Sequence, residues 1–275
     1  MTTATIENPD VRLDHDLKQA AASLGAAEAR YLVDAYYLWQ EQRKRSDSQL
    51  RSLREGEEPS DVIAWASSLA TRFEGRIKTL LDSYSDGSPV GRWSKSIVGI
   101  GPVIAAGLLA HIDIEKAPTV GHIWRFAGLD PTVTWERGQK RPWNAELKTL
   151  CWKVGESFVK VSGRDDDIYG HVYLERKLQE CERNERGEFA EQAERKLATT
   201  KIGKTTDAYK AYSTGKLPPA HLHARAKRYA VKLFIAHWHH VAFEVRYGEA
   251  PPKPYIIEHG GHTHYIAPPL WEGLA

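Results

Sequence analysis

The chain of 275 residues has little of what marks several protein classes. It contains two cysteines, Cys151 and Cys181, and no CxxC pair, which excludes a disulfide framework and is typical of a reducing compartment. No run of about eighteen apolar residues occurs, so we expect no membrane-spanning segment. The first ten residues lack the basic and apolar parts of a signal peptide. We therefore expect a disordered tail over 1–10 and a cytoplasmic protein.

The alternating pattern of a β-strand is almost absent too, which predicts an all-α fold. Two long helical patterns flank the break REGEEPSD, and Ser60 is placed to cap the second. They predict a helical hairpin or coiled coil over residues 11–88. After the linker SDGSPVG we expect a helical domain over 92–255, with an insert at about 165–220. An irregular, histidine-rich tail over 256–275 follows.

The net charge of +2 conceals two basic blocks. Residues 91–160 carry ten Lys and Arg against six Asp and Glu, and residues 201–250 carry nine against three. Residues 1–90 and 161–200 are acidic. A basic block suits a polyanion such as nucleic acid, and it equally suits a solvated face.

The run IVGIGPVIAAGLLAHID concentrates glycine and alanine around one proline. It predicts a helix-hairpin-helix in which two glycines form the turn and Pro102 begins the second helix. Backbone N–H groups of such a turn, beside a helix N-terminus, can hold a phosphate without reading sequence. The alternative is a tight turn whose small residues serve packing. The predicted phosphate-contacting residues are Gly99, Ile100, Gly101 and Val103.

Four blocks of sequence follow one another over roughly residues 92–255: GIGPVIAAGLLAHID, FAGLDPT, NAELKTLCWKVGESFVKV and ARAKRYAVKLFIAHWHHVAFEVRYGEAPPKPY. In this order they resemble the C-terminal domain of the insertion-sequence 110/116/902 transposases. The resemblance implies DNA binding and a part in DNA transposition or recombination, with a structured guide RNA as a further partner.

Two parts of that family's machinery are not found. The family has a RuvC-like domain with four metal-binding acidic residues, whereas residues 1–90 read as helices. A separate RuvC-like partner protein would then have to supply that domain. The family's serine nucleophile follows the AGLxP block, but the stretch AGLDPTVTWERGQKRPW contains no serine. Thr132 and Thr134 are its only hydroxyls and hence the candidate nucleophiles. We expect no autonomous cleavage, and enzymatic activity stays open.

Two groups of basic residues extend the predicted interface. Arg137, Lys140 and Arg141 lie between Trp135 and Trp143, where cations would contact a backbone and an indole would stack on a base. A surface loop held by two core tryptophans is the alternative. The second group lies on the last predicted helix, for which a solvated face is the alternative: Arg225, Lys227, Arg228 and Lys232.

Eight of the twelve histidines fall from position 221 onward. Zinc needs about four ligands that converge tetrahedrally, and without cysteines the spacing does not define a site. Zinc is therefore expected only if these rings meet in the fold. The candidate ligands are His237, His240, His259, His262 and His264.

The sequence thus predicts a DNA-binding protein that takes part in transposition without cutting DNA alone. The alternative is an RNA-binding or protein-interaction module on the same helical scaffold. A homo-oligomer through residues 11–85 is a further expectation, and no membrane partner is expected.

Overall fold

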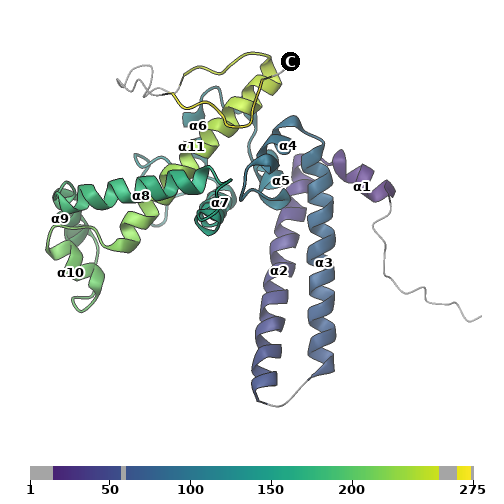
Figure 1. Cartoon of the computed structure of the whole chain (residues 1–275), viewed down its shortest axis with the longest axis horizontal. Helices are drawn as coiled ribbons and strands as arrows, with labels where there is room; N and C mark the ends of the chain where they lie inside the picture. The colour runs from purple at the N-terminus through teal and green to yellow at the C-terminus, as the bar shows by residue number, and fades with distance from the viewer. Residues whose placement is uncertain (1–14, 57–59, 254–264, 274–275) are drawn as a thin grey trace, which may run out of the picture. The chain divides into compact units, whose positions relative to one another are not determined.

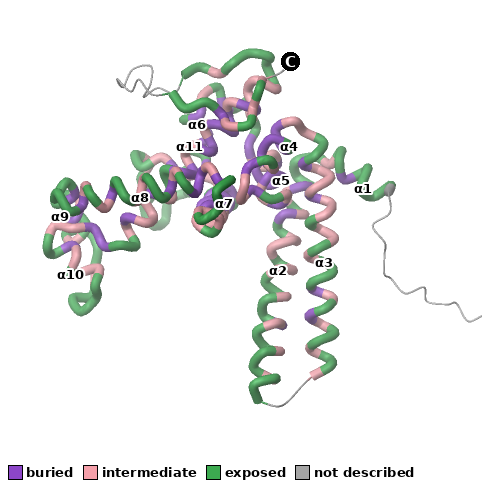
Figure 2. Tube along the Cα trace, in the orientation of Figure 1, coloured by how far each residue is buried: buried purple, intermediate pink, exposed green. Residues whose placement is uncertain are grey.

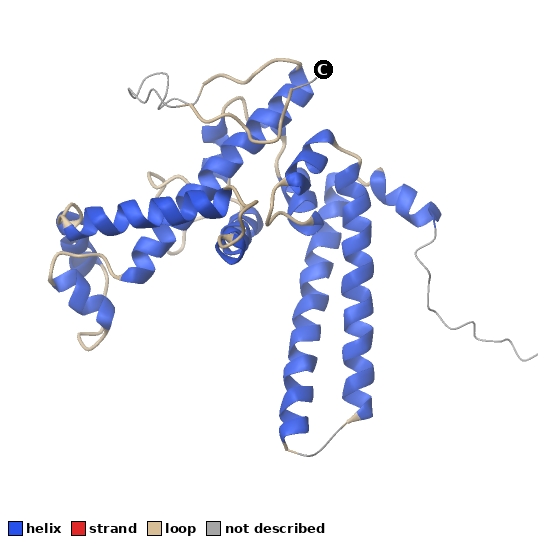
Figure 3. Cartoon of the chain, viewed as in Figure 1, coloured by secondary structure: helices blue, strands red, loops and turns tan. Residues whose placement is uncertain are grey.

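The computed structural model describes residues 15–56, 60–253 and 265–273. Within these residues it has eleven α-helices, one short 3-10 helix and no β-strand, so the predicted all-α fold is confirmed (Figure 3). None of the described helices is both long and apolar enough to cross a membrane.

The chain divides into two compact units and passes between them more than once. The first comprises the described residues up to Lys95 together with Gly101–Asp113. The second comprises Ser96–Ile100 together with the described residues from Ile114 onward.

The first unit is built around a long helical hairpin (Figure 1). Its two long helices lie side by side, and the Ser60 Oγ accepts a hydrogen bond from the Ile63 N–H at 3.3 Å, which confirms the predicted N-cap. The helices of this unit are α1 (His15–Ala22), α2 (Ala26–Glu55), α3 (Asp61–Asp86), α4 (Pro89–Ser96) and α5 (Pro102–His111).

The core of the first unit lies where α5 packs between α2 and α3. Val33 and Leu81 of the long helices are buried against Val103 and Ala106 of α5. Figure 2 shows that buried residues gather at this end of the hairpin. The glycine- and alanine-rich helix thus belongs with the hairpin, whereas the sequence placed it in the following domain, beyond residue 92.

The second unit is organised around the long helix α11. Rings of Phe158 on α7, Tyr169 on α8 and Phe234 on α11 lie 4.9–5.5 Å apart, centroid to centroid, and form its aromatic core. The elements of this unit are η1 (Ile114–Lys116), α6 (Val120–Phe126), α7 (Ala145–Val161), α8 (Tyr169–Glu185), α9 (Ala190–Thr199), α10 (Asp207–Ser213) and α11 (Pro219–Tyr247).

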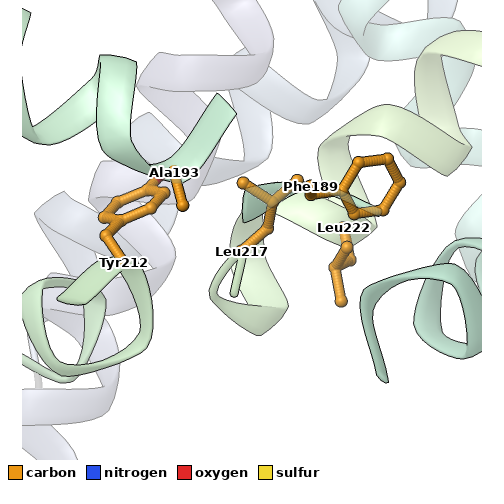
Figure 4. Close-up of a cluster of buried hydrophobic side chains, with 5 residues drawn as sticks. All are labelled: Phe189, Ala193, Tyr212, Leu217 and Leu222. Atoms are coloured by element: carbon orange, nitrogen blue, oxygen red, sulfur yellow. The ribbon is translucent and has the colours of Figure 1, made fainter. Parts of the chain in front are cut away.

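The predicted insert contains helices with a small core of their own. Five side chains from α9, α10 and the segments around them form this cluster: Phe189, Ala193, Tyr212, Leu217 and Leu222 (Figure 4). The Asn184 side chain joins α8 to it, since Nδ2 donates to the Leu217 carbonyl at 3.1 Å and Oδ1 accepts from the Leu217 N–H at 2.8 Å. The insert is therefore a packed part of the second unit.

Candidate nucleic-acid interface

The loop between α6 and α7 is fixed at both of its ends. At its start, Asp130 Oδ1 accepts from both the N–H and the Oγ1 of Thr132, at 2.9 and 2.8 Å. At its end, the Asn144 N–H donates to the Phe126 carbonyl at 2.8 Å. Asn144 Oδ1 also accepts from the Leu147 N–H at 2.8 Å and so caps the start of α7. These hydrogen bonds hold the two ends of the loop over residues 131–143 in place.

The tip of this loop holds one indole in a defined orientation. Trp135 Nε1 donates to the Gln139 carbonyl at 2.7 Å, and the Gln139 N–H donates to the Glu136 carbonyl at 3.2 Å. The guanidinium carbon of Arg141 lies 5.6 Å from the Trp135 ring centroid, within the range of a cation–π contact. Trp135 nevertheless remains 39% exposed. Part of the indole is therefore presented to solvent.

A second indole–cation pair lies beside the first, where the loop meets α7. The Lys148 Nζ is 3.9 Å from the Trp143 ring centroid. Gly128, with φ +63°, lies beneath this pair, and a Cβ there would come within 2.9 Å of Lys148 Cδ and 3.0 Å of Trp143 Cγ. The glycine of the AGLDP stretch is thus required both for its backbone conformation and for close approach.

The two pairs line one open groove with a volume of about 490 Å³. We name it the tryptophan groove. Three of its seven lining residues are tryptophans, two are cations, and Trp152 is 58% exposed. The lining residues are Trp135, Arg141, Trp143, Ala145, Lys148, Thr149 and Trp152.

Helix α11 adds positive charge beside the groove. Burial, and then the charges of Arg228 and Arg141, lower the pKa of Lys148. Burial and the charge of Arg228 also lower the pKa of Lys232, and the charge of Asp130 partly offsets this lowering. Lys232 Nζ lies 4.0 Å from the Trp124 ring centroid. Burial is the largest cause for both lysines, and repulsion from neighbouring cations is a smaller one, which an anionic ligand would relieve.

The other two predicted residues of α11 have partners within the protein. Arg225 Nε donates to Glu180 Oε2 at 2.7 Å, and Arg225 Nη1 donates to Gln192 Oε1 at 3.1 Å. Lys227 pairs with Glu156. Arg228 is exposed, as are the loop residues Arg137 and Lys140, which leaves their charged ends open to a ligand. Lys227 still lies close to the groove, since its Nζ is 5.3 Å from the Trp152 ring centroid.

The groove also contains residues that the sequence analysis did not select. Lys148 and Trp152 were missed, although they are four positions apart at the start of a predicted helix, where such pairs share one face. Trp124 was missed because its relation to Lys232 depends on packing between α6 and α11. The i, i+4 spacing was the one local signal available.

The predicted glycine turn has two different glycines. Gly99 has φ +93°, and a Cβ there would lie 3.2–3.4 Å from Val161, Phe158 and Ser157 of α7. Its carbonyl accepts from Ser157 Oγ at 2.5 Å. Gly101 is exposed, has φ −92°, and would have nothing within 4 Å of an added Cβ. Packing therefore accounts for Gly99 but not for Gly101.

The side chains of the two apolar turn residues face the interior. Ile100 is 4% exposed and Val103 is 6% exposed. Any contact of these residues with a phosphate would use their backbone N–H groups. Such a contact stays a prediction for all four residues of the turn.

Replacement by alanine should lower the free energy of unfolding by different amounts at the two glycines. We expect Gly99→Ala to lower the free energy of unfolding by about 1–2 kcal/mol, because the left-handed backbone is strained by a Cβ. Gly101→Ala, with an extended backbone and open space, should lower it less, by about 0.5 kcal/mol, because alanine is a poorer N-cap residue than glycine. Urea unfolding followed by circular dichroism measures both. Equal losses would contradict this assignment.

The candidate threonine nucleophiles lie at the start of the loop. The Thr132 hydroxyl donates to Asp130, and the backbone and side-chain hydrogen bonds from Thr132 lower the pKa of the Asp130 carboxyl. A carboxylate with a lowered pKa is a weak base, so this arrangement stabilises a turn and activates the hydroxyl little. Thr134 is exposed.

The candidate zinc ligands fall into two sets. His237 uses both ring nitrogens: Nε2–H donates to the Ile266 carbonyl at 2.9 Å, so Nδ1 accepts from the Tyr169 hydroxyl at 2.7 Å. His240 Nδ1 lies 2.9 Å from the Tyr265 hydroxyl. The described part of the chain holds no group of three His, Cys, Asp or Glu side chains arranged for a metal ion. The remaining candidates lie outside the described residues: His259, His262 and His264.

Comparison with known proteins identifies one family. Residues 94–141 match the model of the Transposase IS116/IS110/IS902 family. No curated protein and no solved structure matches the chain. The matched segment includes α5, α6 and the loop that carries Trp135 and Arg141.

Proposed function

Because residues 94–141 carry a transposase-family domain, which supports a role in transposition, we propose that the chain binds DNA through the tryptophan groove and the cations beside it. In this proposal the chain is the DNA-binding part of a transposition system and does not cut DNA by itself.

One observation carries the DNA-binding proposal, namely the convergence of cations and indoles at one surface. Arg141 and Lys148 lie in the groove, and Arg228 and Lys232 act on the same surface from α11. The Asp130 carboxylate, which acts on Lys232, is itself hydrogen-bonded by Thr132. Phosphates would neutralise this charge, and contacts to phosphates give affinity without sequence preference.

The absence of cleavage rests on the chemistry of the loop. Strand transfer needs a nucleophile held in line with the scissile phosphate, and charge stabilisation by cations or metal. No serine occurs between Ala127 and Trp143, and the Thr132 hydroxyl is bound to a weakly basic carboxylate. A RuvC-like partner protein would supply the metal-binding carboxylates.

The test is the double substitution Arg141→Gln with Lys148→Gln. Measured by fluorescence anisotropy over a salt series, DNA affinity should fall about tenfold at moderate salt. The slope of log affinity against log salt should flatten by about two, since each lost phosphate contact removes about 0.9. With Mg²⁺ present, gel analysis of the same samples should show no nicked DNA and no covalent adduct.

The matched control removes two lysines from an exposed loop of the same unit. Lys201→Gln with Lys204→Gln makes the same change in net charge away from the groove. The control should keep most of the affinity. If both doubles weaken binding equally, general charge and not the groove binds DNA. A covalent adduct that Thr132→Ala with Thr134→Ala removes would contradict the absence of cleavage.

A further inference from the structure

The groove offers ring faces as well as charge. Trp135 is 39% exposed and Trp152 is 58% exposed, both in one groove with the half-buried Trp143. Phosphate binding alone needs cations but no indoles. Exposed aromatic faces beside cations are the arrangement by which proteins hold the bases of a single strand.

The indoles are placed for stacking rather than for reading base edges. Trp135 Nε1 is bonded to the Gln139 carbonyl, so its ring is held in place, with Arg141 over it and 39% of the residue still exposed. The cations lie close to the rings, with Arg141 5.6 Å from the Trp135 centroid and Lys148 3.9 Å from that of Trp143. A base on an indole would thus place its phosphate near a cation.

Paired bases cannot use these faces, because in a duplex each base is already stacked on its neighbours. An unpaired nucleotide can use them, and the groove volume of about 490 Å³ lies within the ordinary range of ligand sites. Building on the proposed function, we infer that the tryptophan groove binds unpaired nucleotides of single-stranded DNA, stacking bases on Trp135 and Trp152. DNA is the assigned polymer because the matched family acts in transposition.

The experiment compares a short single strand with a duplex of the same sequence. The single strand should bind more tightly. Trp152→Ala should weaken single-strand binding about tenfold, as expected for one lost stacking contact, and weaken duplex binding by a smaller factor. Trp152→Phe should restore most of the loss, since it keeps an aromatic face. A 2-aminopurine base in the single strand should be quenched on binding to the parent protein and less so by Trp152→Ala.

The matched control is Trp65→Ala, which removes a tryptophan that is 62% exposed on α3. It should change neither affinity, and circular dichroism should show both alanine variants folded. If the duplex binds as tightly as the single strand and Trp152→Ala has no effect, this inference is wrong while the proposed function stands. If neither DNA binds, the proposed function itself fails. Tighter binding of the corresponding RNA strand would overturn the assignment of DNA.

Discussion

Replacing Glu180 by leucine should destabilise the second unit by about 3 kcal/mol, because it leaves an arginine cluster without its buried counter-charge. Glu180 is 1% exposed, and its oxygens lie 2.5 Å from Arg176 Nη2 and 2.7 Å from Arg225 Nε. Burial alone would raise the pKa of this carboxyl, but the hydrogen bonds and charges of Arg225 and Arg176 lower it below its usual range. We place the loss at the low end of the range for buried pairs because each arginine is a quarter to a third exposed.

Urea unfolding at neutral pH measures this loss, and a more conservative variant separates charge from shape. Glu180→Gln keeps the volume and one acceptor oxygen, so it should lose less stability than Glu180→Leu. Glu191→Gln is the control, since its ion pair with Arg195 lies on an exposed surface and should contribute little. A loss for Glu180→Leu no larger than that of the control would contradict the structural role of the cluster.

The same cluster explains why Arg225 differs from the groove cations. Its guanidinium binds Glu180 and Gln192 and lies 4.6 Å from the Phe189 ring, so it joins α11 to the core of the insert. Lys148 has no such partner among the described hydrogen bonds, and burial and neighbouring cations lower its pKa. Arg225 therefore supports the fold around α11, while Lys148 suits a ligand.

What could be predicted from the sequence depends on short-range chemistry. Ser60 and Asn144 each cap a helix through a bond to a residue three positions on, which a local pattern contains. Asp165 to Asp167 directly precede α8, a position where carboxylates often cap a helix, but the N-cap residue is Ile168, which makes no side-chain bond, and Asp167 is buried. Its carboxylate stays beside the first turn of α8, since a Cβ on Gly170 would collide with Asp167 Oδ2.

Helical periodicity likewise predicts which residues share one face of a helix, but not which face the neighbouring helices cover. The sequence places Tyr31 and Leu38 on one side of a helix, yet they are 72% and 68% exposed. Val33 is buried instead, because α5 and α3 pack on the opposite side. The pair of Trp124 and Lys232 shows the same dependence, since the two residues come together only once α6 and α11 have packed.

The free energy of unfolding should fall as the pH is lowered from about 6.5 to 4. Among the histidines, His237 should contribute most to this loss. The neutral ring is satisfied by the Ile266 carbonyl and the Tyr169 hydroxyl, and burial lowers its pKa to about 4. Below pH 6.5 the unfolded chain takes up a proton that the folded chain does not. The stabilisation is therefore complete above 6.5 and is lost towards 4. A shift of that size corresponds to about 3 kcal/mol.

The measurement is urea unfolding at a series of pH values for the parent and for His237→Gln, which cannot titrate in this range. The variant should be less stable at pH 7, because glutamine replaces a ring that makes two hydrogen bonds. Its stability should then depend less steeply on pH between 6.5 and 4, although burial also lowers the pKa of His239 and leaves a residual slope. His171→Gln, at an exposed position, should reproduce the parent curve. An unchanged slope in His237→Gln would show that the pKa of His237 is the same in the folded and the unfolded chain, and with it that folding does not favour the neutral ring.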